Sequence, residues 1–471
     1  MNPTLIKILA LLLSLTLLVA THELGHLAFA KLFRTRVRRY YIFFNWKFSI
    51  IKAKKFGGKW HFLLFNSKTP DSWDEKNLAP EDQNNTLWGL GWIPLGGYCD
   101  IAGMIDETKN ADDLESTPQP WEYRTKPAWQ RLLIVCGGIL VNFLSALVIY
   151  GIMFAHWGTD ELPLRSANLG YDYHQVLLDE GLQNGDIIYA VDGADYYDMT
   201  EVSKAILLNN PRELTVLRGD SLLSLTMSDD LLERINHEGP KQLMGPRMPF
   251  VVKDFVAGSN AQKAGLMKGD SIVSVDDSML VAFSAITASL RRHKGDTLQL
   301  GFYRDGVYMQ LPVAVSDEGM IGVQPSTDIA QLFPGYYHKD YTLLQAIPAG
   351  ISHGWNTLVT YVTSLKVLFS PGGARNLGGF IAMGSIFPST WDWQSFWNIT
   401  ALLALVLAFM NIIPIPGLDG GHVVFTLWEM ITGRKPSDKF LSVVQNIGLA
   451  LLLALMVFAN GNDILRLLGI M

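Results

Sequence analysis

Residues 4–33 read TLIKILALLLSLTLLVATHELGHLAFAKLF, an apolar stretch with a short polar motif near its end. A helix of about 20 apolar residues crosses a bilayer core, because it satisfies its own backbone hydrogen bonds. The stretch therefore predicts a membrane-spanning helix. A cleaved secretory signal is the alternative, but cleavage after Ala20 would separate the apolar run from the motif that begins at His22. We expect an uncleaved helix.

Three further stretches have the length and composition of membrane spans, at about 132–157, 395–418 and 440–460. The hydrophobic share of 49% is high for a purely soluble enzyme and agrees with them. A fifth stretch, 341–365, lacks Asp, Glu, Lys and Arg, but polar residues and a proline dilute it, so we expect an amphipathic helix on the membrane surface. The expected fold class is a polytopic α-helical membrane protein with four transmembrane helices.

The basic residues indicate how the spans are oriented. Every charged residue from Lys31 to Lys59 is basic, and Arg434, Lys435 and Lys439 precede the last span. Loops rich in Lys and Arg stay in the cytoplasm, so both loops are expected there and residues 158–394 on the outer side. The alternative for the basic run is a solvated loop or one that binds lipid headgroups. The formal net charge of −6 argues against a nucleic-acid partner.

An internal repeat lies in the outward region. GLQNGDIIYAVD at 181–192 recurs as GLMKGDSIVSVD at 265–276, and each copy predicts a Gly/Asp turn that feeds a strand. The pattern resembles PDZ domains of bacterial envelope proteases, which implies PDZ-like domains at 159–243 and 244–326, mainly β with some α. Such domains bind an extended peptide as an added strand. The alternative is a pair of β-rich modules that only pack as a cap.

The polar motif in the first span is His22-Glu23-Leu24-Gly25-His26, of the form H-E-x-x-H. Residues four apart share one face of a helix, so both imidazoles can reach one zinc ion, and the glutamate can act as general base on a metal-bound water. Polar residues within an apolar span need partners, and a zinc ion would provide them. The alternative is two hydrogen-bonded histidines near the interface.

A catalytic zinc of this type needs a third protein ligand. Cys99 and Cys136 are the only cysteines and cannot form a cysteine-type site. The third span ends in NIIPIPGLDGGH at 411–422, where Asp419 is the only acid, and the orientation of the spans places it at the depth of the histidines. The prolines would break the helix before it. The alternative is that Asp419 only caps the helix beginning near Gly420.

The pairing of H-E-x-x-H in a first span with N-x-x-P-x-P-x-L-D-G in a later one resembles the site-2 protease family. IPLGGY at 93–98 matches a further segment of that family, and Gly138 and Asn142 match parts of its G-P-x-x-N pattern. PDZ-like modules between the spans resemble its bacterial envelope-stress members. Ile139 departs from the pattern, because the family has a proline there. The segment at 56–92 also looks longer than in the familiar form, and the sequence assigns it no function.

The resemblance implies a role for each matching residue. It implies His22, His26 and Asp419 as ligands of one Zn²⁺ per chain, Glu23 as the base, and Asn411 as a residue that binds substrate or steadies the transition state. An amide there can donate to a developing oxyanion, and the alternative is an asparagine that bridges helices. The structural residues expected near the site are Pro414, Pro416 and Gly420.

The segments expected along the chain follow from these spans and motifs. Before the PDZ-like domains come the first span with H-E-x-x-H at 1–35, a cytoplasmic or membrane-associated β-loop with the insertion at 36–127, and the second span at 128–158. After them come a periplasmic amphipathic-helix region at 327–393 and the third span at 394–420. A cytoplasmic helix and loop at 421–439 and the fourth span at 440–471 complete the expected order. The stretch Arg38–Ile51 is rich in β-forming residues and is expected to enter the membrane as a hairpin whose edge holds extended substrate.

The expected function is intramembrane proteolysis in the bacterial inner membrane, with the site toward the cytoplasm. Expected substrates are single-span proteins, such as an anti-sigma factor after a first cut or a remnant signal peptide, with the PDZ-like pair as a size filter. One alternative is a catalytically inactive PDZ-bearing membrane scaffold or chaperone, although all four catalytic positions are intact. Another is a zinc protease acting on soluble peptides, which would need the motif in a water-facing domain.

Overall fold

The computed structural model describes residues 2–94, 96–105, 117–238, 242–366 and 377–469. Leu95 of the IPLGGY segment lies outside these ranges. The chain divides into two compact units. The first unit contains Met1–Gly158, Asp340–Thr363 and Arg375–Met471, and the second contains Thr159–Lys339 with Ser364–Ala374.

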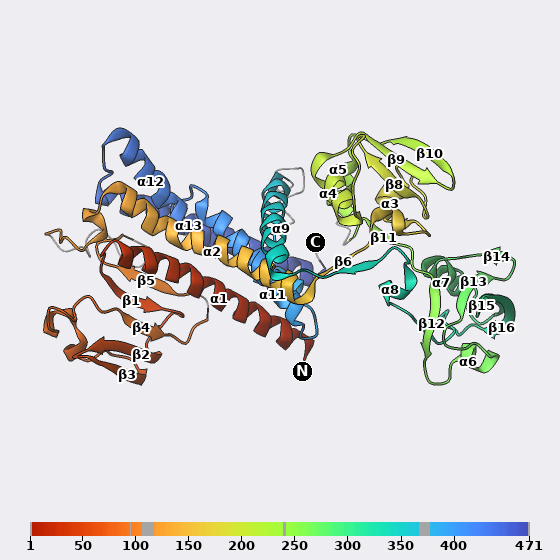
Figure 1. Cartoon of the computed structure of the whole chain (residues 1–471), viewed down its shortest axis with the longest axis horizontal. Coiled ribbons are helices and arrows are strands. Elements are labelled where there is room, and N and C mark those ends of the chain that lie inside the picture. Colours follow the sequence, from red (N-terminus) through yellow and green to blue (C-terminus); the bar gives the residue numbers. More distant parts are fainter. Residues whose placement is uncertain (1, 95, 106–116, 239–241, 367–376, 470–471) are drawn as a thin grey trace. The chain divides into compact units, whose positions relative to one another are not determined.

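The first unit is built on long helices (Figure 1). Within the described ranges, four helices are long and apolar enough to cross a membrane, which confirms the four predicted spans. They are α1 (Pro3–Leu32), α2 (Ala128–Trp157), α11 (Trp393–Ile412) and α13 (Asp438–Leu467). The third helix ends at Ile412, short of the predicted end at 418, because the residue before Pro414 is driven to an extended conformation.

Glycines allow α1 and α2 to approach closely. A Cβ atom on Gly25 would lie 2.3 Å from the carbonyl oxygen of Gly137, and one on Gly137 would lie 2.7 Å from that of Gly25. Small residues bring helix backbones together in membranes, where packing replaces the hydrophobic effect as the driving force. The two helices run side by side along the unit, so the polar motif of α1 lies directly against α2 (Figure 1).

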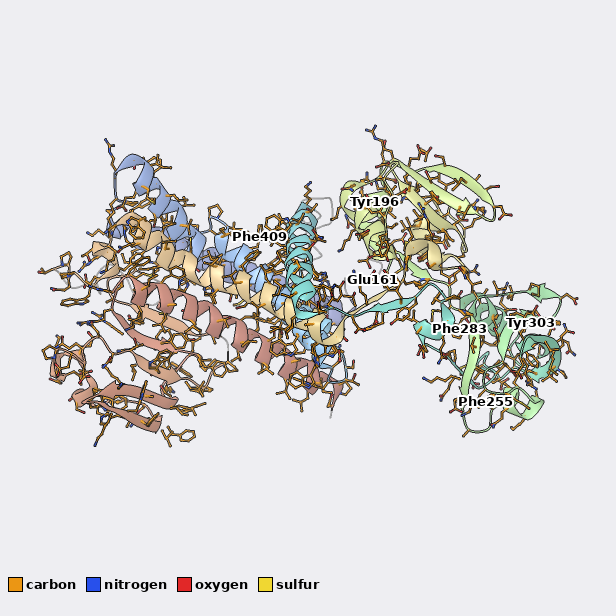
Figure 2. All side chains as sticks on the ribbon, viewed as in Figure 1. Glu161, Tyr196, Phe255, Phe283, Tyr303 and Phe409 are labelled. Atoms are coloured by element: carbon orange, nitrogen blue, oxygen red, sulfur yellow. The ribbon has the colours of Figure 1, made fainter. Side chains whose placement is uncertain are left out.

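The predicted amphipathic helix is present as α9 (Leu343–Ser364) and is not among the four candidate spans. It packs on α2 through the rings of His353 and Tyr150, whose centroids are 4.6 Å apart. It also contacts α11 through Tyr361 and Phe409, with ring centroids 6.0 Å apart (Phe409 is labelled in Figure 2). Two shorter helices, α10 (Phe380–Ile386) and α12 (Asp419–Thr432), complete the helical part.

A five-stranded sheet lies against α1, with strand order β3-β2-β4-β1-β5. Its strands are β1 (Val37–Tyr41), β2 (Ser49–Phe56), β3 (Lys59–Asn66), β4 (Leu87–Leu90) and β5 (Tyr98–Ile101). The Tyr40 hydroxyl donates a hydrogen bond to the Ala20 carbonyl of α1 over 2.7 Å. The sheet is thus attached to a residue inside a candidate span.

The prediction that Arg38–Ile51 forms a hairpin is wrong. β1 and β2 are not neighbours, because β4 lies between them and pairs with β1 in parallel. Parallel strands need a long connection rather than a tight turn. Here that connection includes most of the 56–92 insertion, whose 3-10 turns lie at Asp71–Trp73 and Glu75–Asn77. The strand at the end of the sheet beside α1 is β5.

The second unit contains two β-rich modules, each with its own hydrophobic core. The first is formed by β7 (Tyr171–Tyr173), β8 (Ile187–Val191), β9 (Glu213–Arg218), β10 (Ser221–Thr226), β11 (Met244–Pro246), α3 (Gln175–Leu178), α4 (Met199–Asn209) and α5 (Leu231–Glu238). The second is formed by β12 (Phe250–Phe255), β13 (Ser271–Val275), β14 (Ser278–Met279), β15 (Thr297–Arg304), β16 (Val307–Ala314), β17 (Val323–Pro325), α6 (Asn260–Ala264) and α7 (Phe283–Arg292). The remaining elements are β6 (Thr159–Glu161), which pairs with β18 (Tyr337–Lys339), and α8 (Ile329–Leu332). Because β11 pairs with β7, the first module extends beyond the expected limit at 243.

The sequence repeat corresponds to the same local structure in both modules. Its Gly/Asp turn leads into β8 in the first module and into β13 in the second, as the pattern predicted. The buried Asp186 of the first copy accepts two hydrogen bonds from the guanidinium of Arg218, and Asp270 of the second accepts two from Arg304. The repeated aspartate therefore fixes the turn against a neighbouring strand.

Candidate metal centre

Both histidines of the motif lie on the face of α1 that packs against α2. The Nε2 atoms of His22 and His26 are 3.2 Å apart, and their rings meet edge to face. Both side chains are buried. The spacing of four residues gives this arrangement, because it places the two Cβ atoms one above the other on a helix.

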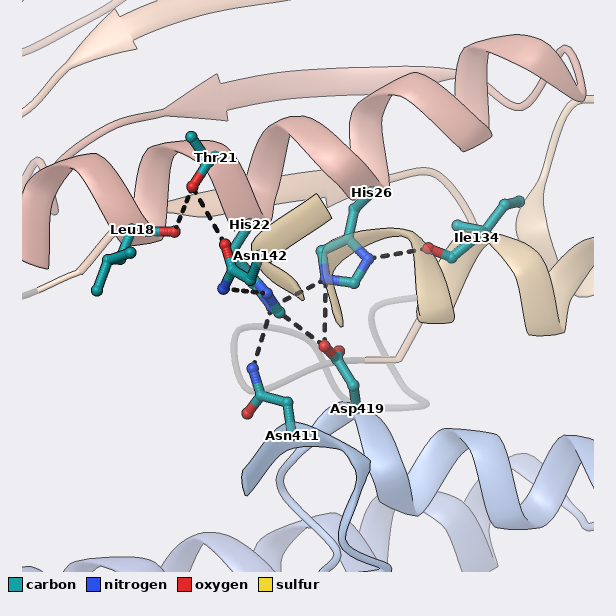
Figure 3. A network of polar contacts seen from close by, with 8 residues as sticks. All are labelled: Leu18, Thr21, His22, His26, Ile134, Asn142, Asn411 and Asp419. Atoms are coloured by element: carbon teal, nitrogen blue, oxygen red, sulfur yellow. Dashed lines mark hydrogen bonds and ion pairs between the residues drawn. The ribbon is translucent and has the colours of Figure 1, made fainter. Parts of the chain in front are cut away.

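Asp419 reaches the histidines from the first residue of α12 (Figure 3). Its Oδ2 atom lies 3.1 Å from Nε2 of His22 and 3.4 Å from Nε2 of His26. Among the described residues, these three form a group whose ligand atoms all lie within 4.8 Å of one another. The two distant motifs therefore meet, as their predicted depth in the membrane required.

The carboxylate of Asp419 does not cap the helix that it begins. Leu418 is the N-cap of α12, and no side chain makes a capping hydrogen bond there. Oδ2 is buried and has no hydrogen-bond partner in the described part of the chain. A buried anionic oxygen without a donor is costly, whereas a cation between it and the two imidazoles would satisfy all three groups. Two imidazole nitrogens and a carboxylate oxygen are also a ligand set that zinc takes.

Polar contacts at Nδ1 of each imidazole leave Nε2 of both histidines free to bind a metal. Nδ1 of His26 lies 2.9 Å from the carbonyl oxygen of Ile134. Because a carbonyl can only accept, Nδ1 carries the proton and Nε2 offers its lone pair, a common arrangement around zinc-bound histidines. Nδ1 of His22 lies 3.3 Å from the side-chain amide of Asn142 on α2 (Figure 3).

The amide of Asn142 can serve His22 in the same way. A half-turn of the carboxamide, which leaves its shape unchanged, presents its oxygen to Nδ1–H of His22 and its nitrogen to the hydroxyl of Thr21. Thr21 Oγ1 lies 3.1 Å from this amide and 3.0 Å from the carbonyl oxygens of Leu17 and Leu18, either of which can accept its proton. The hydrogen bonds between Thr21 of α1 and Asn142 of α2, and between Asn142 and His22, then fix the tautomer of His22.

Gly138 makes room for the imidazoles. A Cβ atom there would lie 2.5 Å from Nε2 of His26 and 2.7 Å from Cε1 of His22. Any larger side chain would displace the rings or separate the helices. The sequence matched Gly138 and Asn142 to a family pattern but gave them no role. Their roles depend on the distance between two helices, for which the sequence carries no local signal.

The turn between α11 and Asp419 is fixed by close packing within it and by contacts with α13. Gly417 adopts a left-handed φ of +89°, and a Cβ atom on Gly420 would lie 2.0 Å from the carbonyl oxygen of Ile413. Gln445 of α13 accepts a hydrogen bond from the Gly417 N–H over 2.5 Å and contacts His422 through its amide nitrogen. The expected structural residues Pro414, Pro416 and Gly420 therefore belong to a tightly packed turn, whereas Gln445 was not anticipated.

A cavity of about 140 Å³ adjoins the three ligand atoms. Glu23 and Asn411 both line it, and Nδ2 of Asn411 lies 3.3 Å from Nε2 of His22. Tyr98 and Cys99 of the edge strand β5 line the same cavity. The space next to the ligands is therefore bordered by a carboxylate, an amide donor and the end of a sheet.

Burial controls the protonation of the phenols beside this cavity. It raises the pKa of Tyr98 to about 12, with the nearby Tyr41 adding to the effect. It also raises the pKa of Tyr40 to about 12, with the charge of Glu23 as a smaller contribution. Both phenols thus stay protonated at neutral pH and act as hydrogen-bond donors.

Comparison with known proteins agrees with this geometry. The family model for peptidase family M50 matches residues 10–67 and 75–455. Protease RseP of Yersinia pestis is 26% identical, over 97% of this chain and 98% of its own length. The regulator of sigma E protease of Haemophilus influenzae is 25% identical over the same shares. A Neisseria meningitidis protein named as a zinc metalloprotease is 25% identical, over 98% of this chain and 99% of its own length. The chain therefore belongs to peptidase family M50, the site-2 protease family, and is a membrane-embedded zinc metalloendopeptidase.

Proposed function

We propose that the enzyme hydrolyses a peptide bond within or near the transmembrane segment of single-span membrane proteins, using His22, His26 and Asp419 to hold one zinc ion per chain. The convergence of these three side chains supports the proposal, because two of the proposed ligands belong to the candidate span α1 and the third lies within 3.1–3.4 Å of them. A peptide bond that reaches such a site must come from a segment that is itself in the bilayer.

Each residue around the cavity has a distinct task in this proposal. His22, His26 and Asp419 would hold the zinc ion, which when bound would supply Lewis acidity toward water and the scissile carbonyl. Glu23 would accept a proton from the attacking water and deliver it to the leaving amine. Asn411 donates an N–H from Nδ2 to the oxygen on which negative charge develops. The hydrogen bond from Nδ1 of His26 to Ile134 and the contact of His22 with Asn142 keep the ligand nitrogens aimed at one point.

The edge strand β5 is the proposed holder of the substrate. A helical substrate hides its peptide bonds in its own hydrogen bonds, so it must become extended before a carbonyl can be attacked. β5 pairs with β1 on one side, and Tyr98 and Cys99 line the metal cavity. A segment added to β5 as a further strand would pass the ligand atoms in extended form. This assigns to β5 the role expected of the Arg38–Ile51 stretch.

The proposed setting is the bacterial inner membrane, with the site toward the cytoplasm and the two β modules in the periplasm. The all-basic run from Lys31 to Lys59 supports this orientation. Substrates of the expected kind are an anti-sigma factor after a first cleavage or a remnant signal peptide. Two of the relatives, named RseP and regulator of sigma E protease, support that choice.

The second module favours an additional peptide-binding role. A groove of about 450 Å³ lies between α7, at Phe283 and Thr287, and the chain around Gly258 and Gly322 (Phe283 is labelled in Figure 2). PDZ-like domains hold an extended peptide in a groove beside a helix. We propose that this groove contacts substrate ends while the modules together exclude bulky outer domains. Cleavage of untrimmed substrates after deletion of both modules would support the size filter, and their continued resistance would contradict it.

The deciding experiment is cleavage of a model single-span substrate by the purified full-length protein. We expect cleavage within or next to the span, loss of cleavage in Glu23→Gln, and loss with a zinc chelator that added zinc reverses. Glu23→Gln should retain its zinc, because Glu23 is not a ligand in this proposal. Cleavage by Glu23→Gln would remove the proposed base. An inactive wild-type protein that still binds the substrate would instead support a scaffold or chaperone.

A further inference from the structure

A second cavity, of about 550 Å³, opens on the sheet of the first unit and shares no lining residue with the metal cavity. Its lining is unusually basic. Five cationic side chains contribute to it, from Arg36, Arg38, Arg39, Lys54 and Lys76. Two anionic side chains, Asp74 and Glu75, face them. The cavity therefore carries an excess of positive charge that its own acids cannot neutralise.

The all-basic run and the 56–92 insertion, to which the sequence assigns no function, build this cavity together. The all-basic run supplies the arginines before and within β1 and the lysine of β2. The insertion supplies the opposite wall through its two 3-10 turns, and Nζ of Lys54 donates to the carbonyl of Trp73 over 2.9 Å. The insertion thus folds over basic residues that would otherwise be dispersed in solvent.

The cationic groups are held in defined positions. The guanidinium of Arg36 lies 4.4 Å from the ring centroid of Trp121 and donates to Oδ1 of Asn84 over 3.0 Å. Glu75 is shared between two arginines, with its carboxylate 3.0 Å from Nη1 of Arg36 and 3.8 Å from Nε of Arg38. Arg39 is 58% exposed in its side chain, and its Nε lies 4.0 Å from Oδ2 of Asp100. Preorganised donors of this kind lose little freedom when a ligand binds.

The charge of Lys54 gives a second reason to expect an anion. Only 4% of this residue is exposed, and burial lowers the pKa of its ammonium group. Arg36 and Arg39 add to that depression, while Glu75 and Asp74 oppose it. A bound anion would stabilise the ammonium form, and a cleft lined by one sign of charge concentrates ligands of the opposite sign.

We propose that this cavity binds a phosphate group, carried either by a soluble phosphate compound or by the headgroup of an anionic phospholipid. Phosphate fits because guanidinium forks pair with its oxygens through two parallel hydrogen bonds, which a single point charge cannot do. The volume is within the range of ligand sites for small molecules. A lipid source is within reach, because the sheet is attached to Ala20 of a candidate span and its β3 strand exposes Trp60, Phe62 and Leu64.

The test measures phosphate binding to the full-length protein in a zwitterionic detergent at one fixed ionic strength. One arm titrates inorganic phosphate and pyrophosphate, and another titrates short-chain phosphatidylglycerol against phosphatidylcholine. The variant is Arg38→Gln with Arg39→Gln, which removes two partly exposed cavity residues. The matched control is Lys55→Gln with Lys59→Gln, which removes the same charge from exposed positions of the same run that do not line the cavity.

We expect the cavity variant to raise the dissociation constant about tenfold or more, because it removes two charge-assisted contacts to the phosphate. The control variant should bind like the wild type, since exposed charges are screened. Tight binding in the first arm alone would identify a soluble phosphate compound, and tight binding of phosphatidylglycerol alone a lipid headgroup. Equal losses in both variants, equal binding of citrate at the same charge, or no binding in either arm would overturn the proposal.

Discussion

The second β module buries Asp270 and the metal centre encloses the Oδ2 atom of a half-buried Asp419, and the surroundings of the two carboxylates differ. In the module, Oδ1 and Oδ2 of Asp270 accept hydrogen bonds of 2.8 and 2.7 Å from Arg304, and Oδ2 accepts another from the backbone of Met267. In the metal centre, Oδ2 of Asp419 is buried against two imidazoles and has no hydrogen-bond partner among the described residues. Donors of the protein itself satisfy the carboxylate of Asp270, whereas the carboxylate of Asp419 needs a cation.

The first module strengthens this comparison. Asp186 repeats the contacts of Asp270, with Arg218 in place of Arg304 and the backbone of Gln183 in place of Met267. A contact set that occurs twice at the same place in a repeat is part of the scaffold. The contacts of Asp419 have no such counterpart in the described part of the chain, and they join one candidate span, α1, to the helix that follows another. A buried charge without a partner indicates chemistry, and a buried charge with partners indicates architecture.

The largest effect is expected from Asp419→Ala. Zinc should fall from one ion per chain to a small fraction of that, and proteolysis should be lost, because a catalytic zinc with two protein ligands is poorly held. Metal analysis of the purified variant and cleavage of a single-span substrate measure both. The two β modules should keep their protection against proteolysis. A variant that keeps stoichiometric zinc would show that Asp419 is not a ligand.

Asn411→Ala should lower kcat about 10²–10³-fold, the usual cost of losing one donor to a developing oxyanion. Its zinc content should stay at the wild-type level, because Asn411 contacts the metal-facing nitrogen of His22 without being a ligand in our proposal. Steady-state kinetics together with metal analysis separate the two roles. Loss of zinc with unchanged kcat per bound ion would instead make Asn411 a residue that only positions His22.

Asp270→Ala tests the other side of the comparison. It leaves the guanidinium of Arg304 without its buried partner, so the second module should open more readily. Hydrogen exchange on the full chain should show its amides exchanging about a hundredfold faster, while zinc content and cleavage of a short substrate stay unchanged. Lys268→Ala is the control, since it breaks only an exposed pair with Asp254. Zinc loss in Asp270→Ala would break the comparison.

The sequence predicted those parts of the fold that depend on local spacing. A run of apolar residues defines a span, positions four apart on a helix share a face, and Pro414 ends a helix. Together with the H-E-x-x-H motif, these rules singled out the three residues whose side chains converge in the structure. They placed the end of α11 too late, because apolar residues continue past the point where the first proline takes effect.

The sequence could not predict pairings between distant segments. The order of strands in the sheet depends on β4, which enters between β1 and β2 from the far end of the insertion. The β-forming composition of Arg38–Ile51 is compatible with a hairpin and with the observed sheet alike, so the local sequence could not choose between them. For the same reason, the basic run gave no sign that the insertion would enclose part of it in a cavity.

Asn142→Leu should have the smallest of these effects on the metal centre. The change keeps the number and branching of the heavy atoms of a fully buried side chain but removes the group that can accept the proton on Nδ1 of His22. The imidazole can then bind protons at either nitrogen, so part of the population loses its ligand lone pair. Zinc affinity, measured by competition with a chelator, should fall about 10–100-fold, as for other partners of metal-bound histidines.

Asn142→Asp is the control that makes this prediction specific. A carboxylate at this position still accepts from Nδ1–H of His22, so zinc affinity should return to at least the wild-type level. The spectrum of the cobalt-substituted protein should likewise match the wild type in Asn142→Asp and change in Asn142→Leu. If both variants lose zinc equally, then Asn142 only fills space between α1 and α2. In that case the orientation of His22 would depend on the close approach of Gly138 to the rings.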